Sequence, residues 1–343
     1  MCWSLPFPQV AASPPQPVPT QSSPAPRSAA DELWGEPVVS LQSVTKTFGN
    51  HVVVDDISLE VKAGQIFGLI GPSGCGKTTL VKMLVGLVSP TSGKATVRGV
   101  EPARFTTRDR SGIGYTPQGF FLYPTLTVLE NAKFVASLYG VSLLQRRRRI
   151  KEVLTFLEIW DARKHLAANI SGGMQRRLSL ACALFHKPSV IFVDEPTSGL
   201  DPVLRAKVWD YLSELRNGGT TVFLTTQHID EAGHCDRVGI LNKGSIVALG
   251  APDDIRREAL GGEVIAVEGG SYTREDVIAL WELPSVKKVD WDGRDKLRIM
   301  VDDAATATPA VTELLHNRGT QFTALMPYLP SFDEVFIELV QRQ

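Results

Sequence analysis

Residues 71–78, GPSGCGKT, match a phosphate-binding template in which Gly and four further residues precede Gly, Lys and then Ser or Thr. The apolar run at 66–70, before the segment, predicts a buried strand, and the apolar residues at helical spacing after the segment predict a helix. The glycines let backbone amides approach a phosphate, and the start of the helix adds unpaired N–H groups and a positive dipole. Lys77 would reach the outer phosphates, and the Thr78 hydroxyl would ligate Mg2+. The segment predicts binding of a nucleoside triphosphate by Gly71, Ser73, Gly74, Gly76, Lys77, Thr78 and Thr79.

A pair of adjacent carboxylates ends the apolar run VIFVDEP at 190–196. The run predicts a buried strand, and side chains at the carboxyl end of such a strand emerge into the crevice that holds the phosphates. Asp194 is placed to hold Mg2+, and Glu195 is placed to take a proton from the attacking water. The alternative is an acidic turn after a buried strand, and the phosphate loop earlier in the chain argues against this alternative.

The segment NISGGMQRR offers a second place for a phosphate, because Ser171, Gly172 and Gly173 open an apolar helix that runs through 178–184. One nucleotide cannot easily satisfy both phosphate sites of one chain. If each subunit lends its second site to the nucleotide of its partner, both sites are used. A two-fold sandwich dimer follows as a hypothesis.

The bulk composition excludes several classes of protein. A net charge of −1 over 343 residues gives no basic footprint for nucleic acid, so no nucleic-acid partner is expected. The four cysteines are scattered without metal or disulfide spacing, which indicates a reducing compartment. Cys75 lies in the phosphate loop, where the helix N-terminus could lower its pKa, but we interpret it as a tolerated small residue rather than a nucleophile. No apolar run of about 18 residues exists, so a membrane role would require a partner.

The elements that must position these residues follow an α/β pattern. Residues 1–37 form a Pro/Ser-rich extension that we expect to be disordered, because eight of the 22 prolines lie in the first 36 residues. Strand-like runs lead into the phosphate loop, and the part from about 119 to 184 is mostly helical, which predicts an inserted helical subdomain. The run Arg146–Arg149 should open one of these helices and form a solvated face, with a nucleic-acid or lipid contact as the alternative.

After residue 262 the pattern changes to a small α+β unit, 263–343, with strands and helices in ferredoxin-like order. Its last helix is marked by Ser331 and Glu334, which form a capping box ahead of an apolar stripe. The unit carries no catalytic constellation, so we expect a structural or regulatory role.

The phosphate loop, ISGGM at 170–174, VIFVDEP and SGLDP at 198–202 occur in the order and at the spacings of ATP-binding cassette (ABC) ATPases, and the chain resembles this family over residues 38–262. The resemblance implies a P-loop fold with an inserted helical subdomain. It further implies that Phe48 stacks on adenine, with core packing as the alternative, and that Gln118 touches Mg2+ and moves with the subdomain. Ser171 and Gly173 would meet the γ-phosphate held by the opposed subunit, and Asp201 would link the two active sites.

Two positions depart from the family pattern. Met174 replaces the last residue of the usual signature LSGGQ, as in members that resemble drug exporters. In LTTQHIDEA, Gln227 stands where the family has its switch histidine, and His228 follows one place later. Glutamine can hydrogen-bond a phosphate but cannot carry a proton. We favour Gln227 as the switch residue, with His228 as the alternative.

The resemblance implies the ATPase subunit of an ABC exporter, with ATP and Mg2+ as cofactors. It would work as a homodimer or with a paralogous subunit, and would be held at the cytoplasmic face of the cell membrane by a separate transmembrane permease. The tail PYLPSFDEVFIELV resembles that of drug and antibiotic exporters. The rivals are a soluble ABC protein of translation or DNA repair and a P-loop kinase or GTPase. The absence of a tandem cassette or long coiled coil argues against the first, and the second phosphate-binding helix argues against the other.

Overall fold

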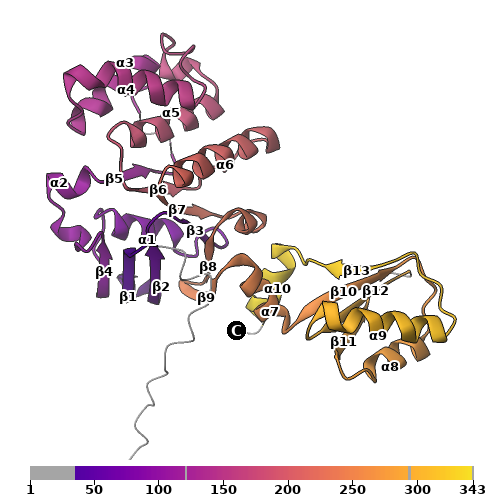
Figure 1. Cartoon of the computed structure of the whole chain (residues 1–343). Helices are drawn as coiled ribbons and strands as arrows, with labels where there is room; N and C mark the ends of the chain where they lie inside the picture. The colour runs from indigo at the N-terminus through magenta and orange to yellow at the C-terminus, as the bar shows by residue number, and fades with distance from the viewer. Residues whose placement is uncertain (1–34, 120–121, 293–294, 342–343) are drawn as a thin grey trace, which may run out of the picture. The chain divides into compact units, whose positions relative to one another are not determined.

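The computed structural model describes residues 35–119, 122–292 and 295–341 (Figure 1). Except for its last three residues, the predicted extension 1–37 lies outside the described residues. The described chain forms three β-sheets and the helices around them. The predicted α/β class, with a helical part and a C-terminal α+β unit, is confirmed.

A six-stranded sheet positions the chemistry. Its strands are parallel except for the edge strand β9, and its inner strands are continuous apolar runs, as expected for a sheet covered on both faces. Because β6, β7 and β3 are neighbours, the segments that follow these strands emerge at one edge of the sheet. The order is β5 (Ile113–Thr116), β6 (Val190–Asp194), β7 (Thr221–Thr226), β3 (Ile66–Ile70), β8 (Arg237–Asn242) and β9 (Ser245–Gly250).

A second, antiparallel sheet packs beside the helix that follows the phosphate loop. Its strands share one hydrophobic cluster with α1 (Lys77–Leu84) and with the side chains of Phe67 and Leu69. This packing fixes the start of α1, and with it the phosphate loop. The order is β2 (His51–Lys62), β1 (Pro37–Phe48) and β4 (Ser92–Val97), followed along the chain by the short helices η2 (Pro102–Arg104) and α2 (Thr107–Arg110).

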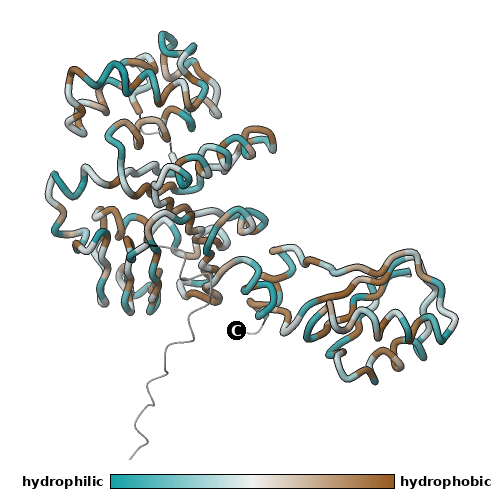
Figure 2. Tube along the Cα trace, in the orientation of Figure 1, coloured by the Kyte–Doolittle hydropathy of each residue, from teal (hydrophilic) through white to brown (hydrophobic). Residues whose placement is uncertain are grey.

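Most of the remaining helices of the cassette lie between residues 128 and 217. Figure 1 shows α3, α4 and α5 grouped together, and Figure 2 shows hydrophobic and hydrophilic positions alternating along them, as amphipathic helices require. These three helices fall within the predicted insertion. The helices are α3 (Val128–Leu138), α4 (Leu143–Phe156), η3 (Ala167–Asn169), α5 (Gly172–Leu184), α6 (Pro202–Asn217), and further on η4 (Ile229–His234) and α7 (Pro252–Leu260).

The arginine run differs in two ways from the prediction. Helix α4 begins at Leu143, so the run lies in its second turn rather than at its start. Arg146 donates hydrogen bonds to the Val141 carbonyl, and Arg149 donates one of 3.1 Å to the Leu184 carbonyl. Four successive residues of a helix point in different directions around its axis. The side chains of Arg146 and Arg149 are therefore half-buried, and only Arg147 and Arg148 lie on a solvated face.

The C-terminal sheet is antiparallel and has its own hydrophobic cluster, which includes Ile265, Leu297 and Leu315. Strands and helices alternate in the ferredoxin-like order predicted from the sequence. The sheet order is β11 (Val286–Trp291), β12 (Lys296–Val301), β10 (Glu263–Glu268) and β13 (Ala324–Tyr328), with helices α8 (Arg274–Trp281) and α9 (Ala304–Asn317).

The last helix, α10 (Phe332–Gln341), does not pack with this sheet's cluster. Phe332 and Val335 belong instead to the large cluster of the cassette, and α10 contacts α7 and η4. The predicted capping box is confirmed: the Glu334 amide donates to Ser331 Oγ at 3.3 Å, and the Ser331 amide donates to Glu334 Oε2 at 3.2 Å. The chain thus returns from the C-terminal sheet to the cassette.

Candidate nucleotide-binding site

The phosphate loop joins β3 to α1 in a backbone path that requires glycine. Gly76 precedes α1 with φ +111°, and a Cβ there would lie 2.6 Å from the Val53 carbonyl oxygen. A Cβ on Gly71 would lie 2.1 Å from the carbonyl oxygen of Leu241. Ser73 and Gly74 are exposed, so the outer side of the loop is open to a ligand.

Lys77 is held at this loop by the backbone. Its Nζ atom donates to the carbonyls of Gly71 at 2.8 Å and Pro72 at 3.0 Å, and it lies 3.9 Å from Glu195 Oε1. The side chain is buried, so its charge acts with little screening by water. Thr78 and Thr79 follow in the first turn of α1 and are half-buried. The structure therefore brings the predicted cation to the loop that would hold the phosphates.

Asp194, at the end of β6, has one satisfied and one unsatisfied oxygen. Oδ1 accepts from Thr78 Oγ1 at 3.2 Å and from Thr225 Oγ1 at 2.5 Å. Oδ2 is buried and has no hydrogen-bond partner among the described residues. Buried carboxylate oxygens are normally paired, and Mg2+ prefers one or two carboxylates together with phosphate oxygens. The oxygens of Asp194 and Thr78 therefore fit the magnesium ion that ATP chemistry implies.

Burial and the charge of Asp194 raise the pKa of Tyr115 to about 12, so this phenol stays protonated beside the carboxylate. Among the described residues, no group of three or more His, Cys, Asp or Glu side chains could hold a metal ion. A site in which one carboxylate and a hydroxyl share the ion with phosphate needs no such group.

Glu195 follows in a backbone conformation that few residues adopt, with φ +50°. Its amide donates to the Thr225 carbonyl at 3.1 Å, which holds this conformation against β7. The Oε2 atom accepts a hydrogen bond of 2.6 Å from Gln118 Nε2. The carboxylate is buried between Gln118 and Lys77, so three of the predicted site residues meet at one point.

The two switch candidates follow β7 at the same edge of the sheet. The Gly71 amide donates to the Thr226 carbonyl at 3.3 Å, so Gln227 is one residue away from a contact with the phosphate loop. Gln227 is exposed and His228 is half-buried, with the His228 amide bonded to Thr226 Oγ1 at 3.0 Å. The switch assignment stays a prediction.

Phe48, at the end of β1, is 51 % exposed, and Lys46 Nζ lies 5.0 Å from the centre of its ring. The alternative of core packing for Phe48 is therefore wrong. An exposed aromatic ring beside a cation is available for stacking on a flat base.

The second set of predicted residues caps two helices. Ser171 Oγ accepts from the Met174 amide at 3.3 Å at the start of α5, and Asp201 Oδ1 accepts from the Val203 and Leu204 amides, each at 3.0 Å, at the start of α6. A Cβ on Gly173 would lie 2.8 Å from Leu204 Cδ1, whereas one on Gly172 would meet open space. Over the described residues, no hydrogen bond or ion pair joins Ser171 or Asp201 to the phosphate loop.

The comparison with known proteins identifies the family. The model of the ABC transporter family matches residues 54–198, and that of the DrrA1-3-like ATP-binding protein, C-terminal domain, matches residues 250–340. The linearmycin resistance ATP-binding protein LnrL of Bacillus subtilis is 32 % identical over 310 residues, which cover 89 % of this chain and 99 % of LnrL. The chain belongs to the ATP-binding proteins of ABC transporters.

Two further relatives are ATP-binding proteins of the same family. The daunorubicin resistance ATP-binding protein DrrA3 of Streptomyces coeruleorubidus is 34 % identical over 88 % of this chain and 95 % of DrrA3. The probable multidrug ABC transporter ATP-binding protein YbhF of Escherichia coli is 38 % identical over 67 % of this chain, but the match spans only 40 % of YbhF. The predicted family and its DrrA-like branch are confirmed.

Solved structures agree with this fold. A dimeric bacterial ABC transporter cassette, MJ0796, is 30 % identical with a TM-score of 0.57, over 62 % of this chain and 98 % of that cassette. The same cassette is known as a dimer in a post-hydrolysis state bound to ADP and Pi.

Sequence reasoning missed one residue that organises the ABC ATPase site. Arg176, in the second turn of α5, donates to the Gln118 carbonyl at 2.6 Å and to the Ser198 carbonyl at 3.0 Å. It ties the helix that starts at Ser171 to the segments carrying Gln118 and the SGLD motif. Burial lowers the pKa of this guanidinium, while the nearby charges of Glu195 and Asp194 act in the opposite direction. Its only sequence signal is its position one turn after the two glycines.

Cys75 fits its interpretation as a tolerated small residue rather than a nucleophile, because the helix N-terminus does not lower its pKa. The thiol is buried in the loop, and this desolvation raises its pKa more than the charge of Lys77 lowers it. The cassette therefore holds Cys75 as a protonated, packed side chain.

Proposed function

We propose that two copies of this chain, or one copy and a paralogous subunit, close around two molecules of Mg-ATP and drive a separate transmembrane permease. The observation that carries the proposal is the meeting of Lys77, Gln118 and Glu195 beside Asp194 at the end of β6. A phosphate-binding cation, a water-orienting carboxylate and an oxygen site for magnesium are the parts that phosphoryl transfer to water requires.

Each residue has a defined role in this proposal. Backbone amides of the loop from Gly71 to Gly76 and the Lys77 ammonium hold the β- and γ-phosphates, together with Thr79 at the helix start. Glu195 accepts a proton from the attacking water, and Gln227 contacts the γ-phosphate as the switch residue. Phe48 stacks on the adenine ring. Thr78, Gln118 and Asp194 would hold Mg2+, which would supply positive charge to offset that of the phosphates.

The proposed dimer gives a role to a second helix N-terminus, which no hydrogen bond among the described residues joins to the phosphate loop. Ser171, Gly172 and Gly173 open α5, a helix of 13 residues whose first amides and dipole favour an anion. We assign these residues to the γ-phosphate held by the opposite subunit and Asp201 to the contact between the two sites. The dimeric state of the MJ0796 cassette supports this arrangement.

The partner and the location follow from the family. No helix in the described part of the chain is long and apolar enough to cross a bilayer. The relatives LnrL and DrrA3 are named as resistance ATP-binding proteins, which supports an export function. We place this subunit at the cytoplasmic face of the cell membrane, attached through its permease. In this proposal the cassette comprises residues 38–262, with the helical subdomain at about 119–184, and the accessory domain comprises 263–343.

The dimer can be tested with the full chain and Glu195→Gln, which removes the proton acceptor while keeping the size of the side chain. We expect this variant to become a dimer in light-scattering chromatography with Mg-ATP and to remain a monomer with EDTA. The matched control is Glu195→Gln combined with Ser171→Arg, which should bind ATP and stay monomeric. A Glu195→Gln variant that stays monomeric with ATP bound would contradict the sandwich.

A second measurement tests the partner. Affinity purification of the full chain from membranes should recover a polytopic membrane protein. Recovery of ribosomes or DNA in its place would favour the soluble class of ABC proteins.

A further inference from the structure

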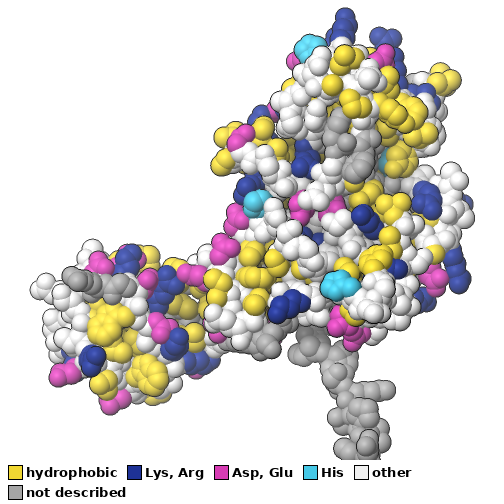
Figure 3. Space-filling view, turned by 180° about the vertical axis from the view of Figure 1, so that it is seen from behind, with side chains coloured by type: hydrophobic (Ala, Val, Ile, Leu, Met, Phe, Trp, Pro, Cys, Tyr) yellow, Lys and Arg dark blue, Asp and Glu magenta, His cyan; other side chains and the backbone are white. Residues whose placement is uncertain are grey.

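The helical part of the cassette carries a charge that the whole chain does not. Residues 122–184 contain ten Lys and Arg against four Asp and Glu, a net charge of +6, whereas the whole chain has −1. Figure 3 shows Lys and Arg side chains projecting from the end of the cassette that α3 and α4 form, with hydrophobic side chains among them. An excess of one sign on one part of a protein creates a field that selects oppositely charged partners.

Helix α4 concentrates this charge on its outer face. Leu144, Arg147, Arg148 and Lys151 follow each other at helical spacing and are all exposed. The opposite side of the helix, with residues 150, 153 and 154, is buried. The outer face is therefore one stripe that begins with a leucine and continues with three cations.

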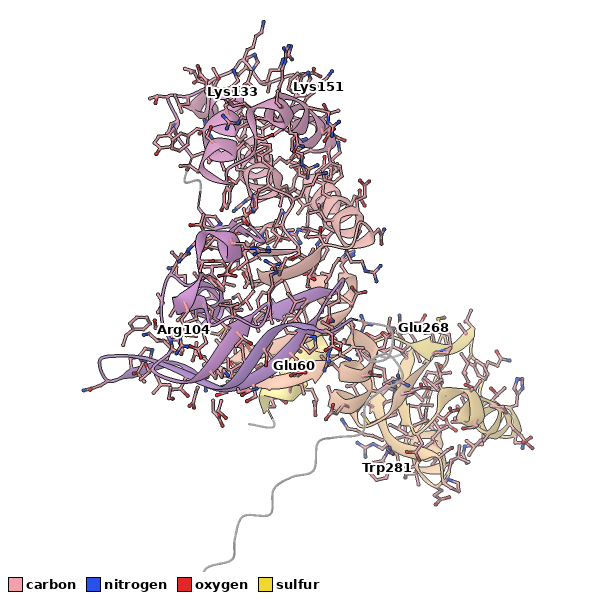
Figure 4. The ribbon with its side chains drawn as sticks, turned by 60° about the vertical axis from the view of Figure 1, so that its left-hand side comes forward. Glu60, Arg104, Lys133, Lys151, Glu268 and Trp281 are labelled. Carbon is pink, nitrogen blue, oxygen red and sulfur yellow. The ribbon has the colours of Figure 1, made fainter. Side chains whose placement is uncertain are left out.

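The apolar end of this stripe is unusually exposed. Leu144 is 96 % exposed, Leu143 is 79 % exposed, and Leu138 at the end of α3 is 69 % exposed. Figure 4 shows Lys133 of α3 and Lys151 of α4 at the same end of the cassette. We call the exposed cations and leucines of the two helices the basic end; they are Lys133, Leu138, Leu143, Leu144, Arg147, Arg148 and Lys151, and the exposed carboxylates of the same helices are Glu130 and Glu152.

We propose that the basic end binds the anionic phospholipid surface of the membrane beside the permease. The arginines and lysines would contact lipid phosphates, while the leucines enter the headgroup region. This inference rests on the proposed function only because a permease partner is what brings the cassette to the membrane.

Two observations favour lipid over a protein segment as the occupant. Arg148 pairs with Glu152 at 3.2 Å, but within the described residues Arg147 has no ion-pair or hydrogen-bond partner, so the stripe keeps a net positive charge. Leu143 and Leu144 stand at the start of α4 and Leu138 at the end of α3, and none of the three lines either of the two cavities beside these helices. One cavity, of about 580 Å3, is lined by residues that include Arg149, Val153 and Phe156, and the other, of about 120 Å3, by residues that include Leu122, Val135 and Tyr139. A protein helix needs such a hollow, whereas a fluid headgroup layer adapts to a projecting surface.

Sedimentation of the full chain with vesicles tests this proposal. We expect binding to phosphatidylcholine vesicles that contain phosphatidylglycerol, weak binding to pure phosphatidylcholine, and loss of binding as salt rises. The triple variant Arg147→Gln, Arg148→Gln, Lys151→Gln should bind on the order of a hundredfold more weakly, since each cation near an anionic surface contributes about a factor of five. Leu143→Ser with Leu144→Ser should weaken the binding that remains at high salt.

The matched control removes three exposed cations elsewhere, by Lys94→Gln, Arg108→Gln and Arg274→Gln, and should bind as the wild type does. Equal losses in both triple variants, or binding by the α4 variants at the wild-type level, would overturn the proposal. If vesicle binding is absent and the α4 variants instead lose the permease on co-purification, the surface is a protein contact and the proposal is wrong. Vesicle binding needs no nucleotide, so its failure is distinct from a failure of ATP-driven dimerisation.

Discussion

Gln118 Nε2 donates a hydrogen bond of 2.6 Å to Glu195 Oε2. The two residues follow the neighbouring strands β5 and β6, and Arg176 of α5 fixes the Gln118 carbonyl at 2.6 Å. The carboxylate assigned to proton transfer is therefore held by a segment that is itself tied to the helix starting at Ser171. A shift of that helix would move Glu195 through two successive hydrogen bonds, from Arg176 to Gln118 and from Gln118 to Glu195.

Gln118→Ala should lower the rate of ATP hydrolysis about tenfold or more while leaving ATP binding nearly unchanged, because a misplaced catalytic group loses more rate than affinity. Steady-state phosphate release and equilibrium nucleotide binding measure the two effects. Gln321→Ala, at an exposed position of the C-terminal domain, is the control. A Gln118→Ala variant with wild-type kcat would remove the positioning role of this hydrogen bond.

Gln227→Ala and His228→Ala separate the two switch candidates. We expect the Gln227 variant to lose more hydrolysis, since Gln227 directly follows Thr226, whose carbonyl accepts from the Gly71 amide. Single-turnover hydrolysis with saturating Mg-ATP provides the comparison. If His228→Ala loses ATP hydrolysis while Gln227→Ala keeps it, the assignment is reversed and His228 is the switch residue.

Asp194→Asn should abolish the dependence of nucleotide binding on magnesium. In the wild type, Asp194 Oδ2 is buried without a partner and is the oxygen available to the ion. The wild type should bind ATP more tightly with Mg2+ than with EDTA, and the variant should bind equally in both. Hydrolysis should fall about a hundredfold or more in the variant, as expected when several kcal/mol of charge stabilisation is lost. A variant that keeps the wild-type response to Mg2+ would place the ion elsewhere.

Phe332→Ala tests the return of α10 to the cassette. Phe332 is 2 % exposed, and the Arg256 guanidinium lies 4.0 Å from the centre of its ring. Removing this ring should lower the free energy of unfolding of the cassette by about 3–5 kcal/mol, measured by urea denaturation. Ile337, on the same helix, is 56 % exposed, and Ile337→Ala should cost about 0.5 kcal/mol or less. Equal effects would mean that α10 does not pack on the cassette in solution.

The catalytic segments could be predicted because each is a local pattern. The loop at 71–78 needs glycine where a Cβ would meet backbone atoms, and the carboxylates of Asp194 and Glu195 directly follow an apolar strand. The ferredoxin-like order of the tail was likewise readable from alternating apolar periods. The interpretation of the arginine run failed because tertiary packing decides burial, and this packing half-buries Arg146 and Arg149.

The amino-acid sequence by itself determined which segments offer a phosphate loop and a pair of carboxylates after a buried strand, because backbone conformation and side-chain chemistry are properties of neighbouring residues. Only the tertiary structure decided that Gln118 meets Glu195, that Arg176 joins Gln118 to Ser198, and that Phe332 packs into the cassette. These contacts join residues from 22 to more than 70 positions apart, and they depend on the strand order β5-β6-β7-β3 and on the packing of whole helices. No local periodicity in the sequence encodes the strand order, because the order results from the packing of all the helices and sheets that buries their apolar faces together.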